Sequence, residues 1–291
     1  MEEHHKPVLL SEVLQALNPQ PGENYLDFTA GYAGHASRIL DVTQNYKDSI
    51  LVDRDENAIK YLSEKFANTK INIMHDDFYS AALQLCKCGN TFDMILADFG
   101  VSSPQLDVGS RGFSFMHEGP LDMRMDSRQE LSADTIINTW SEKQLCEIFS
   151  NYGEMSPGFS QKVARIILTQ RPFRTTTELA DAIAKETRKS RIHPATRVFQ
   201  AVRIAVNDEL GIIAKTLPLL PKLLKPGGRV AIITFHSLED RLVKDFFKDA
   251  SQKGEESELK IINKKPIIAE KVELVNHPRA RSAKLRVARG C

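Results

Sequence analysis

The sequence has few cysteines and no long apolar run, and each of these two shortages excludes a class of protein. Its 291 residues include four cysteines, which fit reduced thiols. Cys86 and Cys88 have one residue between them, not the two to four of a zinc hook, and no cysteine or histidine pair completes a ligand set, so no metal site is expected. No apolar run approaches the roughly 20 residues of a membrane helix, so no membrane partner is expected.

The charge balance leaves nucleic acid open as a partner. There are 39 basic and 38 acidic residues, a net charge of +1, but a basic patch can lie inside a neutral total. The opening MEEHHKPVLL resembles neither a secretory signal nor an Arg-rich transit peptide. We therefore expect the protein to be cytoplasmic.

Short apolar runs alternate with helical patterns over the first hundred residues. Strands are expected at 23–29, 49–55, 71–77 and 92–100, with a helical pattern in each interval. This β-α-β alternation predicts a parallel sheet with helices on both faces. The continuous apolar run MILADF fits a strand buried on both sides.

The alternation stops from about residue 102 to residue 207. Only helical runs are recognised there, one of them opening at Thr176 or Thr177 as its N-cap. One long helix over 195–217 then leads back to the sheet, LKPGG stops it, and RVAIITF forms a buried fifth strand. We thus predict a first part of the core at 1–104, a helical insertion that recognises substrate at 105–207, and a second part of the core at 208–291 with a basic C-terminal strand.

The segment DFTAGYAGH, 27–35, lies between the first strand and the first helix of this pattern. Its glycines allow the backbone to approach a ligand closely. Gly31 and Gly34 alone match neither the G-x-G-x-x-G of dinucleotide sites nor a phosphate-binding P-loop. Asp27 disfavours a pyrophosphate and suits a cation.

Further acidic residues follow the next strands. Asp53 ends the second strand, where an acid can hold both ribose hydroxyls, and Asp76, Asp77 and Phe78 end the third, where they can bracket an adenine. Ligands of such sheets bind at the carboxyl ends of the strands. A cation site, a ribose acid and an adenine bracket together favour S-adenosylmethionine, which has no phosphate.

The fourth strand ends in the segment ADFGVSSPQLD, and Asp98 is the first polar residue of this segment. The exocyclic amine of a nucleobase is a poor nucleophile because its lone pair is delocalised into the ring. Asp98 can accept a hydrogen bond from such an amine, and the rest of the catalysis is then mainly alignment. Asp98 is therefore the candidate catalytic residue, and a cap on the following turn is the alternative.

Several long segments, in order along nearly the whole chain, carry a resemblance to one family. They are DFGVSSPQLD, RGFSF, GPLDMRMD, RIHPATRVFQAVRIAVNDEL, LKPGGRVAIITFHSLEDR and PRARSAKLRVA. In these segments the chain resembles the RsmH/MraW family. The resemblance implies an α/β fold, a Rossmann-like class I methyltransferase sheet with a helical insertion domain after the fourth strand. It also implies S-adenosyl-L-methionine as cofactor and the N4 amine of a cytidine in the decoding region of 16S rRNA, in the small ribosomal subunit, as substrate.

The resemblance also assigns cofactor-binding residues. They are Asp27, Gly31, Ala33, Gly34, His35, Asp53, Phe78, Asp98 and Gln105. Two residues depart from the family pattern, since Phe28 and Ala33 stand where the family has glycine. Ala33 fits the loop if its φ is negative. Phe28 either points into the layer between sheet and helices or narrows the site.

Basic and polar groups in the second half of the chain are candidate RNA contacts. Those on the long helix share one face because they recur every three to four residues, and we expect that face to line the cofactor cleft. The candidates are Arg197, Gln200, Arg203 and Asn207 on this face, His236 after the fifth strand, and Arg279 and Arg281 in the tail. Phe113 and Phe115 are candidates to stack on a base. For all of them a purely structural or solvated role is the alternative.

Three other functions are compatible with parts of the sequence. A DNA amino-methyltransferase usually has Asp/Asn/Ser-Pro-Pro-Tyr/Phe after the fourth strand, where this chain has DFGV, so DNA is not expected as a partner. A dinucleotide oxidoreductase is disfavoured by the incomplete glycine pattern. An RNA-binding protein that has lost its cofactor is conceivable because of Phe28. A homodimer is possible in the family, and nothing in the sequence decides it.

Overall fold

The computed structural model describes residues 7–187, 193–252 and 254–291. The chain divides into two compact units. The first unit contains Met1–Gly100 and Leu210–Cys291, and the second contains Val101–Glu209. Among the described residues no helix is both long and apolar enough to cross a membrane.

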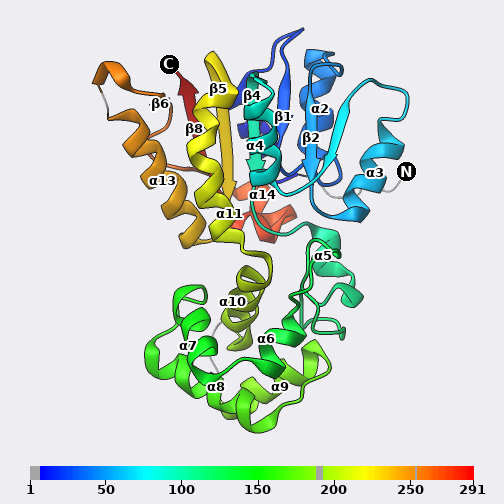
Figure 1. Cartoon of the computed structure of the whole chain (residues 1–291), viewed down its shortest axis with the longest axis vertical. Coiled ribbons are helices and arrows are strands. Elements are labelled where there is room, and N and C mark those ends of the chain that lie inside the picture. Colours follow the sequence, from blue (N-terminus) through cyan, green and yellow to red (C-terminus); the bar gives the residue numbers. More distant parts are fainter. Residues whose placement is uncertain (1–6, 188–192, 253) are drawn as a thin grey trace. The chain divides into compact units, whose positions relative to one another are not determined.

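The first unit is built on one mixed sheet (Figure 1). Its strands are β1 Tyr25–Asp27, β2 Ile50–Asp53, β3 Asn72–His75, β4 Phe92–Asp98, β5 Leu224–Thr234, β6 Leu259–Ile261, β7 Ile267–Ile268 and β8 Lys284–Gly290. The strand order is β3-β2-β1-β4-β5-β8-β6, with β7 also paired to β8. Strands β1 to β5 are parallel, and β8 is antiparallel to β5. The strand order reverses between β1 and β4, which is where open α/β sheets bind their ligands.

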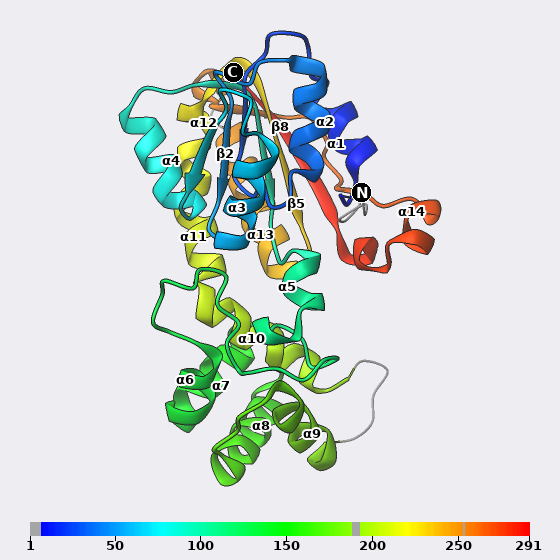
Figure 2. The ribbon, with the colours of Figure 1, turned by 90° about the vertical axis from the view of Figure 1, so that its right-hand side faces the viewer.

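Helices cover both faces of this sheet (Figure 2). They are α1 Leu10–Leu17, α2 Gly34–Thr43, α3 Glu56–Lys65, α4 Phe78–Lys87, α11 Glu209–Thr216, α12 Leu220–Leu223, α13 Ser237–Ser251 and α14 Lys271–Asn276. Apolar side chains of α1, α2 and α3 pack on one face, and those of α4, α11, α12 and α13 pack on the other. Strand β4 supplies both cores, since Met94 and Leu96 point to one face and Ile95 to the other, all fully buried. The expected parallel sheet with two helical layers is confirmed.

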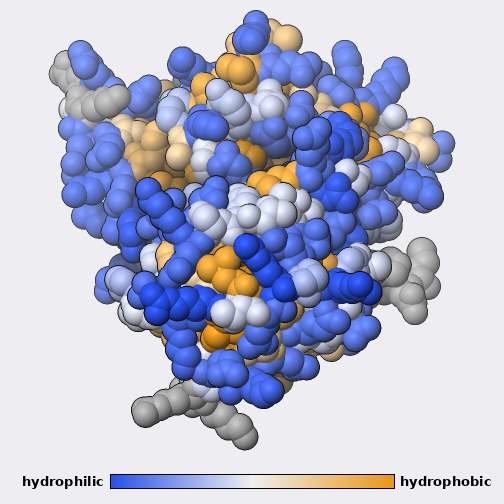
Figure 3. All heavy atoms as spheres, turned by 60° about the horizontal axis from the view of Figure 1, so that its bottom comes forward, coloured by the Kyte–Doolittle hydropathy of each residue, from blue (hydrophilic) through white to orange (hydrophobic). Residues whose placement is uncertain are grey.

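The second unit is helical (Figure 1). Its helices are α5 Ser103–Asp107, α6 Ala133–Thr139, α7 Glu142–Asn151, α8 Pro157–Gln170, α9 Thr176–Glu186 and α10 Ala195–Asn207. Helix α10 packs against α6, α7 and α9 around a separate apolar core. The β pairing within the described part of this unit is one bridge, between Pro120 and Thr175. Figure 3 shows hydrophilic residues over most of the face it presents, with hydrophobic residues in smaller groups between them.

Three local expectations were wrong. The helix expected over 195–217 is two helices, because Asp208 adopts a left-handed backbone with φ of 46°. The N-cap of α9 is Thr175, whose hydroxyl accepts from the Glu178 N–H in a capping box, rather than Thr176 or Thr177. LKPGG directly follows the end of α12 at Leu223, as expected of a helix stop, but β5 already begins at Leu224 rather than at Arg229.

Candidate functional site

Three aspartates end neighbouring parallel strands of the first unit. Asp27 is the last residue of β1, Asp53 of β2 and Asp98 of β4. Because β1 pairs in parallel with both β2 and β4, the three carboxylates lie at one edge of the sheet. This edge is the carboxyl end, where the sequence placed the site.

Asp27 is the most buried of the three, with 2% of its surface exposed. Its Oδ2 accepts from the Tyr25 hydroxyl at 2.7 Å and its Oδ1 accepts from the Thr29 N–H at 3.0 Å. Burial raises the pKa of Asp27 to about 6, although those hydrogen bonds and the nearby His35 favour the charged form. Asp27 therefore holds the start of the loop, and its expected contact with a cofactor stays a prediction.

Asp27→Asn is expected to change how stability depends on pH. A carboxyl whose pKa is raised on folding stabilises the fold fully below the unfolded value of 3.8, and this contribution is lost as pH rises through about 6. Relative to Asp27→Asn, the wild type should lose on the order of 3 kcal/mol of unfolding free energy between about pH 4 and pH 7. Urea unfolding at several pH values measures this difference. A difference that is constant over the range would contradict the assignment.

Asp53 fastens the loop to the second strand. Its Oδ2 accepts from the Gly31 N–H and its Oδ1 from the Asp55 N–H, both at 2.8 Å. Burial raises the pKa of Asp53, and the two backbone hydrogen bonds oppose that rise. Each carboxylate oxygen has a second lone pair, so Asp53 can also accept from two ribose hydroxyls.

The loop turns through two left-handed residues. Gly31 has a φ of 50° and Ala33 has a φ of 60°. The condition that Ala33 has a negative φ is therefore not met, and the glycine usual in the family fits this backbone better. Ala33 remains buried at the N-cap of α2, with 1% exposed. Gly34 follows at the first position of α2, where a Cβ would lie 3.1 Å from Pro7.

Ala33→Gly is expected to be nearly neutral for stability. It relieves about 1–2 kcal/mol of left-handed strain, and it loses about 0.8 kcal/mol of methyl burial and about 0.4–1 kcal/mol through the more flexible unfolded chain. The control Ala36→Gly removes an equally buried methyl from α2 without such relief, and should destabilise by about 2 kcal/mol. Denaturant midpoints compare the two variants. Equal losses would contradict the strain at Ala33.

Phe28 points into the layer between sheet and helices, which is the first of the two expected alternatives. It is 2% exposed and meets Phe78 edge-on, with 6.5 Å between ring centroids. Phe78 in turn lies 5.3 Å from Phe99 and is the first residue of α4, capped by the Asp77 side chain. Phe28 thus supports the ring of Phe78 from the core.

Asp98 and His35 face each other at the end of β4. His35 Nε2 lies 3.7 Å from Asp98 Oδ2. The Asp98 N–H donates to the Thr29 hydroxyl at 2.6 Å, which ties the strand end to the loop. Asp98 Oδ1 is buried and has no hydrogen-bond partner within the described part of the chain.

Buried polar atoms at this edge fit the cofactor that the sequence predicts. Besides Asp98 Oδ1, both ring nitrogens of His35 and the Ser37 hydroxyl are buried and have no hydrogen-bond partner in the described residues. Buried polar groups are nearly always hydrogen-bonded, so these atoms suit a ligand with several donors and acceptors. S-adenosylmethionine offers an ammonium, a carboxylate and two ribose hydroxyls. The described residues contain no cluster of metal ligands.

His236 is the N-cap of α13. Its Nδ1 accepts from the Glu239 N–H at 3.4 Å, and its Nε2 lies 3.2 Å from Glu239 Oε1. Glu239 Oε2 accepts a hydrogen bond from the Phe235 N–H at 2.7 Å. The structural alternative for His236 therefore has direct support, and a contact with substrate stays a prediction.

The predicted polar face of α10 makes hydrogen bonds within the second unit. Asn207 accepts from the Met125 N–H and donates to the Met123 carbonyl, each at 2.8 Å. Arg203 forms a bidentate pair with Glu209. Gln200 and Arg197 donate to loop carbonyls, of Tyr152 and Glu154. These bonds explain a polar stripe on a largely buried helix, and a role in RNA binding stays a prediction.

Gln105 also has a local role in the second unit. Its side chain accepts from the Ser102 N–H at 3.0 Å and completes the capping box of α5. Of the two phenylalanines of RGFSF, Phe113 is buried in the core, with 5% exposed. Phe115 is half-buried and stacks against His193, with 4.7 Å between ring centroids. Cofactor contact by Gln105 stays a prediction.

The basic tail separates into structural and exposed residues. Arg286 is 7% exposed and pairs with Asp240 at 2.6 Å, and Lys284 pairs with the same carboxylate at 2.9 Å. Burial opposes ionisation of Asp240, but these two partners hold its pKa below its usual value. Arg279 and Arg281 are exposed, as a contact with RNA requires.

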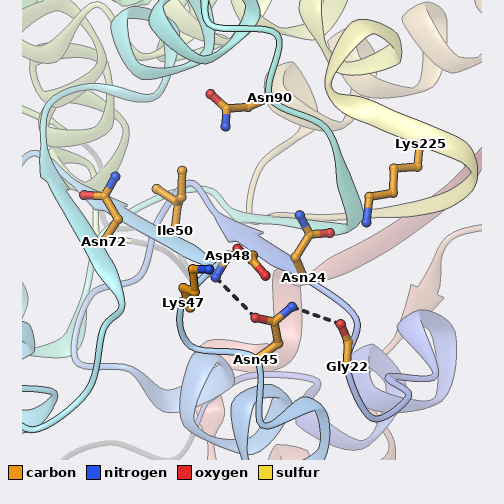
Figure 4. A pocket seen from close by; sticks show the side chains of 9 residues that line it. All are labelled: Gly22, Asn24, Asn45, Lys47, Asp48, Ile50, Asn72, Asn90 and Lys225. Carbon is orange, nitrogen blue, oxygen red and sulfur yellow. Dashed lines mark hydrogen bonds between the residues drawn. The ribbon is translucent and has the colours of Figure 1, made fainter.

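A polar pocket lies at the other edge of the sheet (Figure 4). It is lined by Gly22, Asn24, Asn45, Lys47, Asp48, Ile50, Asn72, Asn90 and Lys225. Ile50 and Asn72 are the first residues of their strands, so this pocket is at the amino ends. The side-chain amides of Asn24 and Asn45 donate to the backbone carbonyls of Thr91 and Gly22, and none of the candidate residues lies here.

Comparisons with known proteins agree along the whole chain. The family described as the MraW methylase family matches residues 2–291. A protein of Synechocystis, named ribosomal RNA small subunit methyltransferase H, is 48% identical over 98% of this chain and 93% of its own length. A protein of the same name from Clostridioides difficile is 43% identical over 99% of both chains.

Solved structures resemble the chain more distantly. TrmN from Thermus thermophilus has a TM-score of 0.45 at 13% identity, covering 97% of this chain and 48% of its own. An rRNA methylase from Streptococcus thermophilus has a TM-score of 0.44 at 7% identity, covering 97% and 93%.

Proposed function

The chain belongs to the MraW methylase family, whose cofactor is S-adenosylmethionine, and on that basis we propose that it methylates the small-subunit ribosomal RNA. More finely, we propose the N4 amine of a cytidine in the decoding region of 16S rRNA as the acceptor. The observation that carries the proposal is the match, at 43–48% identity over nearly the whole chain, to curated proteins named for methylation of this RNA. A substrate of this kind also favours the cytoplasm as the location.

The residues at the carboxyl edge have separate proposed roles. Asp53 would accept hydrogen bonds from the ribose hydroxyls, the backbone of 31–35 would hold the amino-acid part, and Phe78 would contact the adenine. The cofactor supplies an electrophilic methyl group on a sulfonium. Asp98 Oδ1 accepts a hydrogen bond from the target amine, which favours localisation of the nitrogen lone pair and aligns it for attack.

The rival functions receive less support. The curated relatives are named for RNA, and the DFGV segment after β4 lacks the Pro-Pro of DNA amino-methyltransferases. A dinucleotide enzyme is disfavoured because Asp27 and Asp98 place two carboxylates where a pyrophosphate would be repelled. A cofactor-free binding protein is less favoured now that Phe28 lies in the core.

A direct assay of the product tests the proposal. The purified protein is incubated with labelled S-adenosylmethionine and small ribosomal subunits that lack the modification, and the RNA is digested to nucleosides. We expect label in N4-methylcytidine. Label in another nucleoside would overturn the N4 assignment, and binding of subunits without any transfer would favour the binding-protein alternative.

We further propose that Arg279 and Arg281 bind RNA phosphates. Arg279→Ala and Arg281→Ala together should weaken RNA binding several-fold and lower the salt slope of log K by about 1 for each lost contact. Fluorescence titrations at several salt concentrations measure this slope. Lys248→Ala, on the exposed side of α13, is the control and should leave the slope unchanged. An unchanged slope in the double variant would assign both arginines to the solvated surface.

A further inference from the structure

His35 is a buried imidazole without an internal hydrogen bond. It is 6% exposed, and neither ring nitrogen has a hydrogen-bond partner within the described part of the protein. Burying such a polar group without a compensating hydrogen bond is unfavourable. The loop could bind a ligand through its backbone alone, so the cost of the imidazole calls for a function of its side chain.

The surroundings of His35 show what its ring faces. Two carboxylates lie near the His35 ring. Asp98 Oδ2 is 3.7 Å from Nε2, and the buried Asp27 is close enough for His35 to favour its charged form. The Asp27 carboxylate already accepts from Tyr25 and Thr29. Asp98, in contrast, has a buried oxygen, Oδ1, with no hydrogen-bond partner among the residues that the structure describes. Asp98 is therefore the group that His35 is placed to orient.

The backbone and the side chain of Asp98 are controlled differently. Its N–H is fixed by the Thr29 hydroxyl at 2.6 Å, so the Cα position is set by the loop. Among the described residues, the nearby imidazole is the group placed to fix the rotation of the carboxylate. With Oδ2 turned toward His35, the other oxygen is left to accept from a substrate.

We propose that His35 is a positioning residue for methyl transfer. In the reacting complex its Nε2–H closes the 3.7 Å separation from Asp98 Oδ2, donates a hydrogen bond to that oxygen, and holds the carboxylate so that Oδ1 faces the target amine. This inference rests on the proposed function of Asp98, and it gives the His35 side chain a role separate from the cofactor contact expected of the loop backbone. A misaligned acceptor costs rate because the nitrogen, methyl and sulfur must be in line.

Kinetics on two substitutions test the role. His35→Leu fills the same space without a donor, and His35→Gln keeps an N–H donor. We expect His35→Leu to lower kcat about 10–100-fold, which is the loss typical when a residue that orients a reactive side chain is removed. We expect His35→Gln to recover a large part of that loss. Because the ring nitrogens also suit a cofactor contact, kcat is measured at saturating S-adenosylmethionine, and the affinity for S-adenosylhomocysteine is measured separately by calorimetry. Equal losses of kcat in both variants, or a loss of cofactor affinity with kcat unchanged, would overturn the proposal.

An NMR experiment tests the contact between His35 and Asp98 in protein that keeps His35, and it does not depend on turnover. In protein labelled with ¹⁵N-histidine, Asp98→Asn should move the ring-nitrogen resonances of His35, assigned with His35→Gln. Asp41→Asn, on the exposed side of α2, is the control and should leave them in place. No movement with Asp98→Asn would refute the coupling. If the wild type shows this coupling but makes no N4-methylcytidine, the proposed function fails while the contact between His35 and Asp98 stands.

Discussion

Asp98→Ala is expected to lower kcat by about 10²–10⁴-fold, the range for loss of a group that assists proton transfer. The exocyclic amine of cytosine is weakly nucleophilic, and Asp98 Oδ1 is a buried acceptor at the end of β4 without a hydrogen-bond partner in the described part of the chain. The backbone bond from Asp98 to Thr29 does not involve the carboxylate. The variant should therefore keep the loop and lose the acceptor.

The same substitution is expected to leave stability nearly unchanged. Removing a buried oxygen without a hydrogen bond removes a desolvation cost rather than an interaction. Asp98→Asn is the matched variant, since it retains one carbonyl acceptor and should retain more activity than alanine. Single-turnover methylation and thermal unfolding are measured on the same preparations. Full turnover by Asp98→Ala would remove the proposed role, and a large loss of stability would show that Asp98 is structural.

The positions of the site residues could be predicted because strand ends can be read from the sequence. Asp27, Asp53 and Asp98 each follow an apolar run, and parallel pairing brings their carboxyl ends to one edge whatever the lengths of the intervening helices. The register of β1 between β2 and β4 confirms that arrangement. For this reason the fold and the edge were predictable from local patterns.

Features that depend on distant backbone were not predictable. Ala33 and Asp208 are left-handed because the chain must turn between packed elements. Alanine gives no signal of such a turn, and aspartate, although enriched in this region, also occurs widely in helices and loops. Asn207 makes its hydrogen bonds to Met123 and Met125, which are more than eighty residues away in the sequence. Spacing on a helix shows which residues share a face, but it does not show what that face meets.

The proximity of His35 and Asp98 also depends on parts of the chain that are distant in the sequence, and it was not predictable either. The sequence placed His35 in the cofactor loop and Asp98 after the fourth strand, and only the crossing of loop and strand end brings the ring within 3.7 Å of the carboxylate. The signal that could have indicated it is a histidine at a helix start beside two glycines, where a small polar cap is more usual.

Asp53→Ala is expected to weaken S-adenosylmethionine binding about 100-fold. Two hydrogen bonds from ribose hydroxyls to a charged acceptor contribute roughly 1.5–3 kcal/mol each, and a loss near 3 kcal/mol is about two powers of ten in Kd. The substitution also removes the hydrogen bonds that the Gly31 and Asp55 N–H groups donate to the Asp53 carboxylate. The loop therefore loses its connection to β2. Both effects act in the same direction.

Asp53→Asn separates these two effects, because an amide keeps the shape but only one of its two polar ends can accept. If loop anchoring dominates, Asn and Ala should lose similar affinity, since either the Gly31 or the Asp55 N–H then faces a donor. If the ribose contact dominates, Asn should lie between the wild type and Ala. Calorimetric titration with S-adenosylhomocysteine measures all three, and Asp48→Ala, exposed at the opposite edge of the sheet before β2, is the control. Wild-type affinity in Asp53→Ala would place the ribose elsewhere, and with it the site that the three strand-end aspartates define.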